Sequence, residues 1–224
     1  MSQTNMMTLY YHLPTQQSSP HISSYSHVIA DGLFFAFMLC ILSITLVSSS
    51  SSIFLFSFNS WHVNIDIIGF ILPTLLCIYL IGKTRIDISS VLFGITAVTI
   101  MSFFVTTPVV EKGIVSPFPF SLFPAIVGAV ISLIVIPSDQ GVHRFVYSYC
   151  ISVIGVFIGA DLFHIPSLLL HQPNTPMNAV IGGAGLFDLI FISGIISCLL
   201  LLTYVLANNT VESFAQGKGN SVKT

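Results

Sequence analysis

The chain has 224 residues, of which 54% are hydrophobic and only 6% are charged. A soluble domain carries roughly 25% charged residues, so these few charges could not keep a surface of this size in water. The composition excludes a soluble globular protein and predicts that the main partner of the chain is the lipid bilayer. Because the chain also lacks a basic patch, we expect no binding to nucleic acid.

Apolar stretches long enough to cross a bilayer follow one another along the chain. A hydrocarbon core of about 30 Å requires roughly 20 apolar residues per helix. We therefore predict an all-α protein with a polar N-terminal tail (1–27), a transmembrane domain (28–207) and a cytoplasmic C-terminal tail (208–224). The six predicted spans cover residues 28–47, 63–82, 88–107, 118–136, 143–162 and 178–207, and glycines interrupt the start of the last span. The apolar stretch 53–60 is too short to cross, and we expect it at the membrane interface with Trp61 as an anchor.

The positions of the basic residues predict how the chain is oriented. With six spans, five of the six Lys and Arg residues share one side of the membrane: Lys83, Arg85, Arg144, Lys218 and Lys223. Only Lys112 lies on the opposite side. Since basic loops are retained in the cytoplasm, we predict a protein of the cell membrane with both termini in the cytoplasm. Arg144 is expected to be an ordinary solvated loop charge.

The sequence contains no recognisable cofactor or metal motif. The four cysteines lie inside apolar stretches, without metal-ligand spacing or a disulfide pattern: Cys40, Cys77, Cys150 and Cys198. We interpret them as small residues that face lipid or the protein core. No nucleotide, flavin or haem motif is visible, so we predict neither a cofactor nor a metal. Nothing in the sequence indicates an oligomeric state.

Two aspartates at the outer ends of the last two spans are the strongest candidates for a functional site. Asp161 follows Gly159 at the end of the fifth span, and Asp188 lies near the start of the sixth. Ionisable residues within membrane helices are energetically costly, so each needs an explanation. A glycine run precedes Asp188: Gly182, Gly183 and Gly185. If this run is not regular helix, which glycine favours, the two carboxyl groups lie at similar depth.

The helix dipole predicts different roles for the two carboxyl groups. Asp188, at a helix N-terminus, is stabilised as an anion, whereas Asp161, near a helix C-terminus, is destabilised as one. Two carboxylates held close together in a low dielectric repel each other, so one of them is expected to hold a proton. Such a pair could perform acid–base catalysis or bind a proton or a cation. The alternative is that the two carboxyl groups have no functional role and are simply interfacial, hydrated and unpaired.

Other polar residues near the membrane boundary are weaker candidates. Asn64 and Asp66 begin the second span, where Asp66 is interpreted as a helix cap; we also keep both as candidate ligands for a substrate or ion, together with the glycines named above. His164, three residues after Asp161, could supply half of a metal site. Because Pro166 indicates that the helix has already ended, we interpret His164 as an interfacial loop residue.

Several motifs resemble a family of uncharacterised prokaryotic membrane proteins, domain of unknown function 1614. The resemblance covers residues 81–206 and is carried by the segments 158–162 (IGADL) and 182–191 (GGAGLFDLIF), and by the proline-containing loop from Gly113 to Pro119 that leads to Phe123-Pro124-Ala125. The N-terminal third fits poorly. The resemblance implies a role for Asp161 and Asp188 but no reaction.

The same two aspartates are also similar, more distantly, to those of presenilin and signal peptide peptidase, which are intramembrane aspartyl proteases. These proteins carry one Asp in a Tyr-Asp motif and the other in a Gly-x-Gly-Asp motif on the next helix. Here Asp161 follows Ala160 rather than Tyr, and two residues separate Gly185 from Asp188. The Pro-Ala-Leu motif of a later helix has no counterpart. The resemblance implies Asp161 and Asp188 as a catalytic pair acting on a membrane-embedded substrate.

Three functions remain open from the sequence. The first is an aspartyl intramembrane protease, in which one carboxylate activates water and the other carboxyl protonates the peptide. The second is a proton- or cation-coupled transporter or channel, because broken helices at a polar site are typical of transporters. The third is a non-catalytic membrane scaffold, in which small residues such as Gly155 and Gly159 only allow close helix packing.

Overall fold

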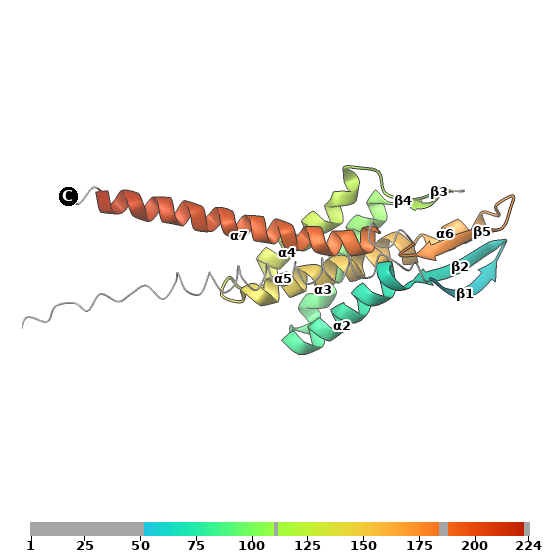
Figure 1. Ribbon diagram of the computed structural model, residues 1–224, viewed down its shortest axis with the longest axis horizontal. Helices are drawn as coiled ribbons and strands as arrows, with labels where there is room; N and C mark the ends of the chain where they lie inside the picture. The colour runs from blue at the N-terminus through green and yellow to red at the C-terminus, as the bar shows by residue number, and fades with distance from the viewer. Residues whose placement is uncertain (1–51, 110–111, 184–187, 222–224) are drawn as a thin grey trace, which may run out of the picture.

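The computed structural model describes residues 52–109, 112–183 and 188–221, and the predicted tail 1–27 and first span 28–47 lie outside this part (Figure 1). The α-helices are α2 (Leu72–Thr84), α3 (Ile88–Val105), α4 (Phe123–Val135), α5 (Gly141–Val156), α6 (Ile165–Leu170) and α7 (Leu189–Ser221). Two π-helical segments, η1 (Ile67–Ile71) and η3 (Phe157–Leu162), adjoin α2 and α5, and a 3-10 turn, η2 (Phe120–Leu122), precedes α4.

Four of the described helical stretches are long and apolar enough to cross a membrane: Ile67–Thr84, Ile88–Val105, Gly141–Leu170 and Leu189–Asn208. A fifth apolar stretch, Phe120–Val135, is shorter. These helices make the chain a multi-pass membrane protein, as the composition predicts. The predicted count of six spans is not confirmed, because the first predicted span is outside the described residues and the fourth is short.

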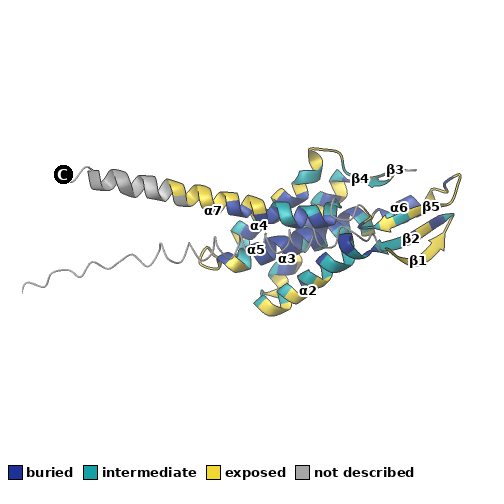
Figure 2. Cartoon of the chain, in the orientation of Figure 1, coloured by how far each residue is buried: buried dark blue, intermediate teal, exposed yellow. Residues whose placement is uncertain are grey.

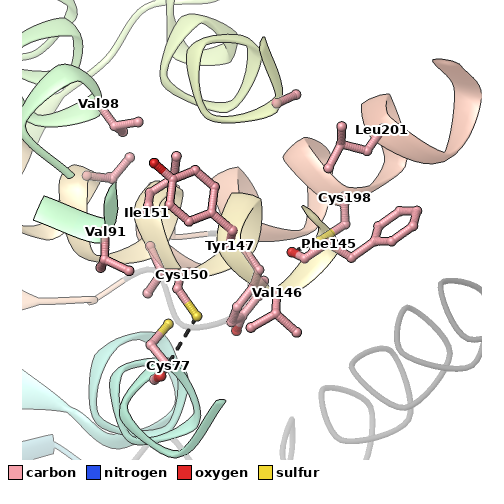
Figure 3. Close-up of a cluster of buried hydrophobic side chains, with 14 of the residues drawn as sticks. Cys77, Val91, Val98, Phe145, Val146, Tyr147, Cys150, Ile151, Cys198 and Leu201 are labelled. Atoms are coloured by element: carbon pink, nitrogen blue, oxygen red, sulfur yellow. Dashed lines mark hydrogen bonds between the residues drawn. The ribbon is translucent and has the colours of Figure 1, made fainter. Parts of the chain in front are cut away.

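Helix α5 lies at the centre of the bundle, with α2, α3, α4 and α7 packed around it (Figure 2). Nearly all of its residues from Phe145 to Val156 are buried. Figure 3 shows Tyr147, Cys150 and Ile151 of α5 among side chains of the neighbouring helices. The Cys150 Sγ lies 3.8 Å from the carbonyl oxygen of Cys77 in α2. The described cysteines therefore behave as small core residues.

Polar side chains satisfy the backbone at several helix ends. Asp66 caps η1, because its Oδ1 accepts hydrogen bonds from the N–H groups of Ile68 (2.9 Å) and Gly69 (2.7 Å). At the other end of the bundle, Arg144 Nε donates to the Ile136 carbonyl just after α4 (2.7 Å). The expectation of a solvated loop charge at Arg144 is therefore wrong: this half-buried side chain binds a carbonyl that the end of α4 leaves without a helical partner.

A small sheet extends the end of the bundle where α2 begins and α5 ends (Figure 1). It contains β1 (Ser52–Phe58), β2 (Trp61–Asp66) and β5 (Met177–Ile181) in the order β1-β2-β5. Strands β1 and β2 form an antiparallel hairpin, whereas β2 and β5 run parallel, from Trp61 opposite Met177 to Ile65 opposite Ile181. A second hairpin joins β3 (Thr107–Val109) to β4 (Gly113–Val115).

These strands correct the all-α prediction. Residues 63–66 and 178–181, which we assigned to the starts of two spans, are strands, and the expected interfacial stretch 53–60 lies mainly in β1. Apolar content alone does not separate a strand from a helix. The two-residue alternation that marks a strand is visible in β5, whose residues alternate between half-buried and exposed. Trp61 is also buried in the sheet, at 1% exposure, rather than placed as a free interfacial anchor.

Candidate functional site

A half-open cavity of about 330 Å³ lies at the sheet end of the bundle. Its walls come from β5, from Val63 of β2, from the β3–β4 hairpin, from α6 and from the two aspartates. Asp161 and Asp188 both line this cavity, so the structure brings together the two residues that the sequence singled out. Among the described residues, Lys112 is the third charged residue in its wall.

Asp161 lies in η3, a π-helical segment that continues α5. Hydrogen bonds in a π-helix join residues five apart. Here the Phe163 N–H donates a hydrogen bond to the Ile158 carbonyl (3.0 Å). The backbone N–H of Gly182 hydrogen-bonds to the Asp161 carboxyl, which also interacts electrostatically with Asp188. Within the described residues, Asp161 Oδ2 is buried and has no hydrogen-bond partner. Such an atom in a native site calls for an explanation, and a bound proton or ligand is one.

Asp188 immediately precedes α7, as the sequence predicts. Its Oδ1 accepts a hydrogen bond from the Ile190 N–H (2.9 Å), and its carbonyl accepts from the Ile192 N–H (2.9 Å). The carboxyl therefore lies at the positive end of a 33-residue helix. This position stabilises Asp188 as an anion, in contrast to Asp161 at the C-terminal end of its helix.

The candidate glycines lie mostly at close backbone contacts. A Cβ on Gly159 would lie 2.3 Å from the Thr99 carbonyl oxygen, and a Cβ on Gly182 would lie 2.8 Å from the Gly69 backbone. Gly182 also has a φ of +70°, a conformation that favours glycine. Of the described candidate glycines, Gly183 lines the cavity, whereas Gly185 lies outside the described residues. Gly182 and Gly183 form a turn directly after β5.

The other candidate site residues, Asn64 and Asp66, do not line the cavity. Asp66 is buried as the cap of η1, and Asn64 Nδ2 donates to the His62 carbonyl (3.0 Å). His164 lies in the turn between η3 and α6, as expected for a loop residue, but its side chain is buried and its Nδ1–H donates to the Gly159 carbonyl (3.1 Å). In the described part of the chain, no group of three or more His, Cys, Asp or Glu residues could hold a metal ion.

Sequence reasoning missed the contribution of Lys112 and of strand β5. Lys112 looks like an ordinary loop charge, yet the β3–β4 hairpin brings it to the cavity that holds both aspartates. A signal was present, because Lys112 is the one basic residue that the charge distribution assigns to the outer side. Asn178 and Val180 of β5 also line the cavity. No local sequence pattern predicts this, because their position depends on pairing with a strand more than 100 residues earlier.

The apolar helices and the carboxyl-lined cavity define a class: multi-pass helical membrane proteins with an acidic site at one end of the bundle. Within that class, the chain belongs to the family described as Protein of unknown function (DUF1614), whose model matches residues 18–200. Searches of curated proteins and of solved structures found no match. The family description carries no reaction with it.

Proposed function

We propose that this protein is an intramembrane hydrolase of the aspartyl type, with Asp161 and Asp188 as its catalytic pair. The observation that carries the proposal is that two carboxyl groups from separate elements line one half-open cavity and interact electrostatically. A cavity of about 330 Å³ lies within the size range of ligand pockets and can hold the groups next to a scissile bond. The distant similarity to presenilin and signal peptide peptidase, at the same two aspartates, supports this choice of reaction.

The surroundings of the two carboxyl groups suggest that one acts as general base and the other as general acid. Asp188, stabilised as an anion by the start of α7, acts as general base and takes a proton from a water molecule. The oxygen of this water attacks the carbonyl carbon of the peptide bond. Asp161, whose Oδ2 has no partner among the described residues, holds a proton and donates it to the carbonyl oxygen.

The tetrahedral intermediate then collapses with cleavage of the C–N bond. The departing nitrogen receives the proton held by Asp188, and the carbonyl oxygen returns its proton to Asp161. One water is consumed, and a carboxylic acid and an amine are released. Both carboxyl groups are thereby restored to their starting protonation states, as a catalytic cycle requires.

The proposal is tested with purified protein reconstituted in lipid vesicles. A panel of single-span apolar peptides is added, and new N-termini are detected by mass spectrometry. We expect cleavage by the unaltered protein and a loss of at least 100-fold in Asp161→Asn and Asp188→Asn, because general acid–base catalysis contributes about that much. Asp139→Asn, an exposed aspartate in the turn between α4 and α5, is the matched control. Unchanged cleavage in both cavity variants would exclude the proposal.

A second candidate, proton-coupled transport, is favoured by one further observation. Within the described residues, four hydroxyl groups in the bundle are buried without a hydrogen-bond partner: those of Thr99, Ser102, Ser148 and Ser152. Thr99 and Ser102 flank Gly159 near the aspartates, and Ser152 contacts Gly128 of α4. Water bound to these groups would form a polar route through the bundle. Proton uptake into vesicles that Asp161→Asn and Ser152→Ala both abolish would favour transport over hydrolysis.

A further inference from the structure

Strand β5 is an edge strand, and its residues line the cavity that holds the two aspartates. In the sheet order β1-β2-β5, β2 covers one side of β5, and no other described strand pairs with the opposite side. Four consecutive residues, 178–181, line the cavity together with Asp161 and Asp188. An edge strand presents a row of backbone N–H and C=O groups that can pair with another extended chain.

The register of the sheet identifies which backbone groups of β5 point away from β2. The Met177 N–H donates to the Ser60 carbonyl (3.0 Å), so Met177 directs its backbone groups towards the β1–β2 hairpin. Because orientation alternates along a strand, Ala179 and Ile181 do the same. Asn178 and Val180 then direct their N–H groups to the open side. The Val180 carbonyl accepts from the Gly183 N–H (3.1 Å) and so is partly used.

The same alternation connects this edge to the catalytic pair. Gly182 continues the series of Asn178 and Val180, and its N–H reaches the Asp161 carboxyl. A chain that pairs with the open edge of β5 would therefore run directly towards Asp161. In addition, Ile165 and Leu168 of α6 form an apolar wall of the cavity. The geometry thus combines a backbone template, an apolar lining and the two carboxyl groups.

We propose that the substrate is an apolar peptide segment that binds in extended form as an added strand on the open edge of β5. This proposal rests on the proposed function and specifies its substrate class. A peptide in a low-dielectric environment must satisfy its backbone groups, and an extended segment can do so only by pairing with a partner such as this edge. Pairing along β5 delivers the next peptide bond to Asp161 and Asp188.

The first test uses two variants at one position. Val180→Pro removes the open-side N–H and leaves the ladder to β2 intact, because proline is tolerated where the N–H of an edge strand faces outwards. Val180→Thr keeps the N–H and the branched side chain and is the matched control. The probe is a synthetic apolar decapeptide containing a non-cleavable hydroxyethylene unit, with binding measured by fluorescence anisotropy in detergent micelles. We expect the affinity to fall about tenfold in Val180→Pro, consistent with one lost hydrogen bond.

A second measurement needs no variant and detects the strand itself. The decapeptide is labelled with ¹³C at one carbonyl, and its infrared amide band is recorded free and bound. We expect the band to move to the position typical of paired strands on binding. A companion series with a single N-methyl group moved along the peptide should weaken binding at alternate positions only. An unshifted band, or equal affinity for Val180→Pro and Val180→Thr, would overturn the added-strand model.

The outcomes also separate this proposal from the proposed function. Asp161→Asn/Asp188→Asn protein should bind the decapeptide as a strand while cleaving none of the apolar panel. If the unaltered protein shifts the infrared amide band of the decapeptide but cleaves no peptide, the hydrolase proposal fails. The proposal that a peptide binds on the open edge of β5 is then retained. If cleavage occurs and Val180→Pro cleaves and binds normally, the proposal of binding on this edge fails and the hydrolase proposal stands.

Discussion

Gly159 lies in η3, in close contact with the backbone of α3. A Cβ at this position would lie 2.3 Å from the Thr99 carbonyl oxygen, so the two segments would have to separate. We expect Gly159→Ala to lower the free energy of unfolding by about 1–3 kcal/mol, as overpacking typically does. The measurement is thermal unfolding in detergent, followed by circular dichroism.

Gly82→Ala is the control for this substitution. Gly82 lies on the exposed side of α2, and a Cβ there would meet nothing within 4 Å. Because alanine is a better helix former than glycine, this variant should be neutral or stabilised by up to about 1 kcal/mol. Equal stability of the two variants would show that the contact between Gly159 and Thr99 is looser than the structure describes.

Asp87 gives the chain a pH-sensitive helix cap outside the membrane-spanning segments. Its carboxylate accepts hydrogen bonds from the Ser89 hydroxyl and from the Ser90 N–H (3.0 Å) at the start of α3. The Ser89 hydroxyl, and next the Ser90 N–H, lower the pKa of Asp87 below its usual value of 3.8. A lowered pKa in the folded state means that the cap stabilises the fold above the unfolded-state pKa.

We therefore expect the Asp87 contribution to be complete above about pH 5 and to disappear as the pH falls through its folded-state pKa. Asp87→Asn keeps a capping side chain without the titrating charge. The difference in unfolding temperature between the unaltered protein and Asp87→Asn, measured from pH 6 down to pH 3, should shrink as the pH falls. A difference that stays constant across this range would assign the cap no charge-dependent role.

At the scale of elements, the β1–β2 hairpin is tied to the rest of the molecule by Trp61. This side chain is 1% exposed, and its Nε1–H donates to the His171 carbonyl just after α6 (2.8 Å). The contact fixes β2 beside the segment that leads into β5, so it supports the wall of the cavity. Asn59 adds a second link, because its Nδ2 donates to the Leu169 carbonyl (3.1 Å).

We expect Trp61→Phe to destabilise the protein by about 1–2 kcal/mol, since it removes this hydrogen bond and leaves a small cavity. Thermal unfolding in detergent measures the effect. Phe58→Leu, at an aromatic residue of β1 that is 50% exposed, should change stability by less than about 0.5 kcal/mol. If both substitutions have the same effect, the hairpin is not held through Trp61.

The arrangement of the whole molecule predicts which end faces the cytoplasm. The α2–α3 and α4–α5 turns lie away from the sheet (Figure 1), and they carry Lys83, Arg85 and, at the start of α5, Arg144. The cavity end carries Lys112. By the positive-inside rule, the cavity should therefore open on the outer side of the membrane.

Cysteine labelling in intact cells tests this orientation. We expect a membrane-impermeant maleimide to label Asn174→Cys, an exposed residue near β5, without permeabilisation. Asp139→Cys, an exposed residue of the α4–α5 turn, should react only after the cells are permeabilised. The unaltered protein controls for the native cysteines, of which Cys77, Cys150 and Cys198 are buried. The reverse labelling pattern would place the cavity on the cytoplasmic side.

Features that depend on composition and on local capping can be predicted from the amino-acid sequence. Its hydrophobicity identified a membrane protein, and the predicted third span, 88–107, closely matches α3 at Ile88–Val105. The sequence predicted Asp188 near the start of the last helix but placed that start at residue 178, whereas α7 begins at Leu189. These properties are local: a helix satisfies its own backbone hydrogen bonds within one segment.

The places where strands replace helices, and the surroundings of the two aspartates, depend on long-range packing. Strand β5 exists as a strand because β2, more than 100 residues earlier, supplies its hydrogen-bonding partner. Lys112 joins the cavity because the β3–β4 hairpin carries it there. Strand pairing and cavity walls join segments that are distant in sequence, so the periodicity of any one segment cannot specify them.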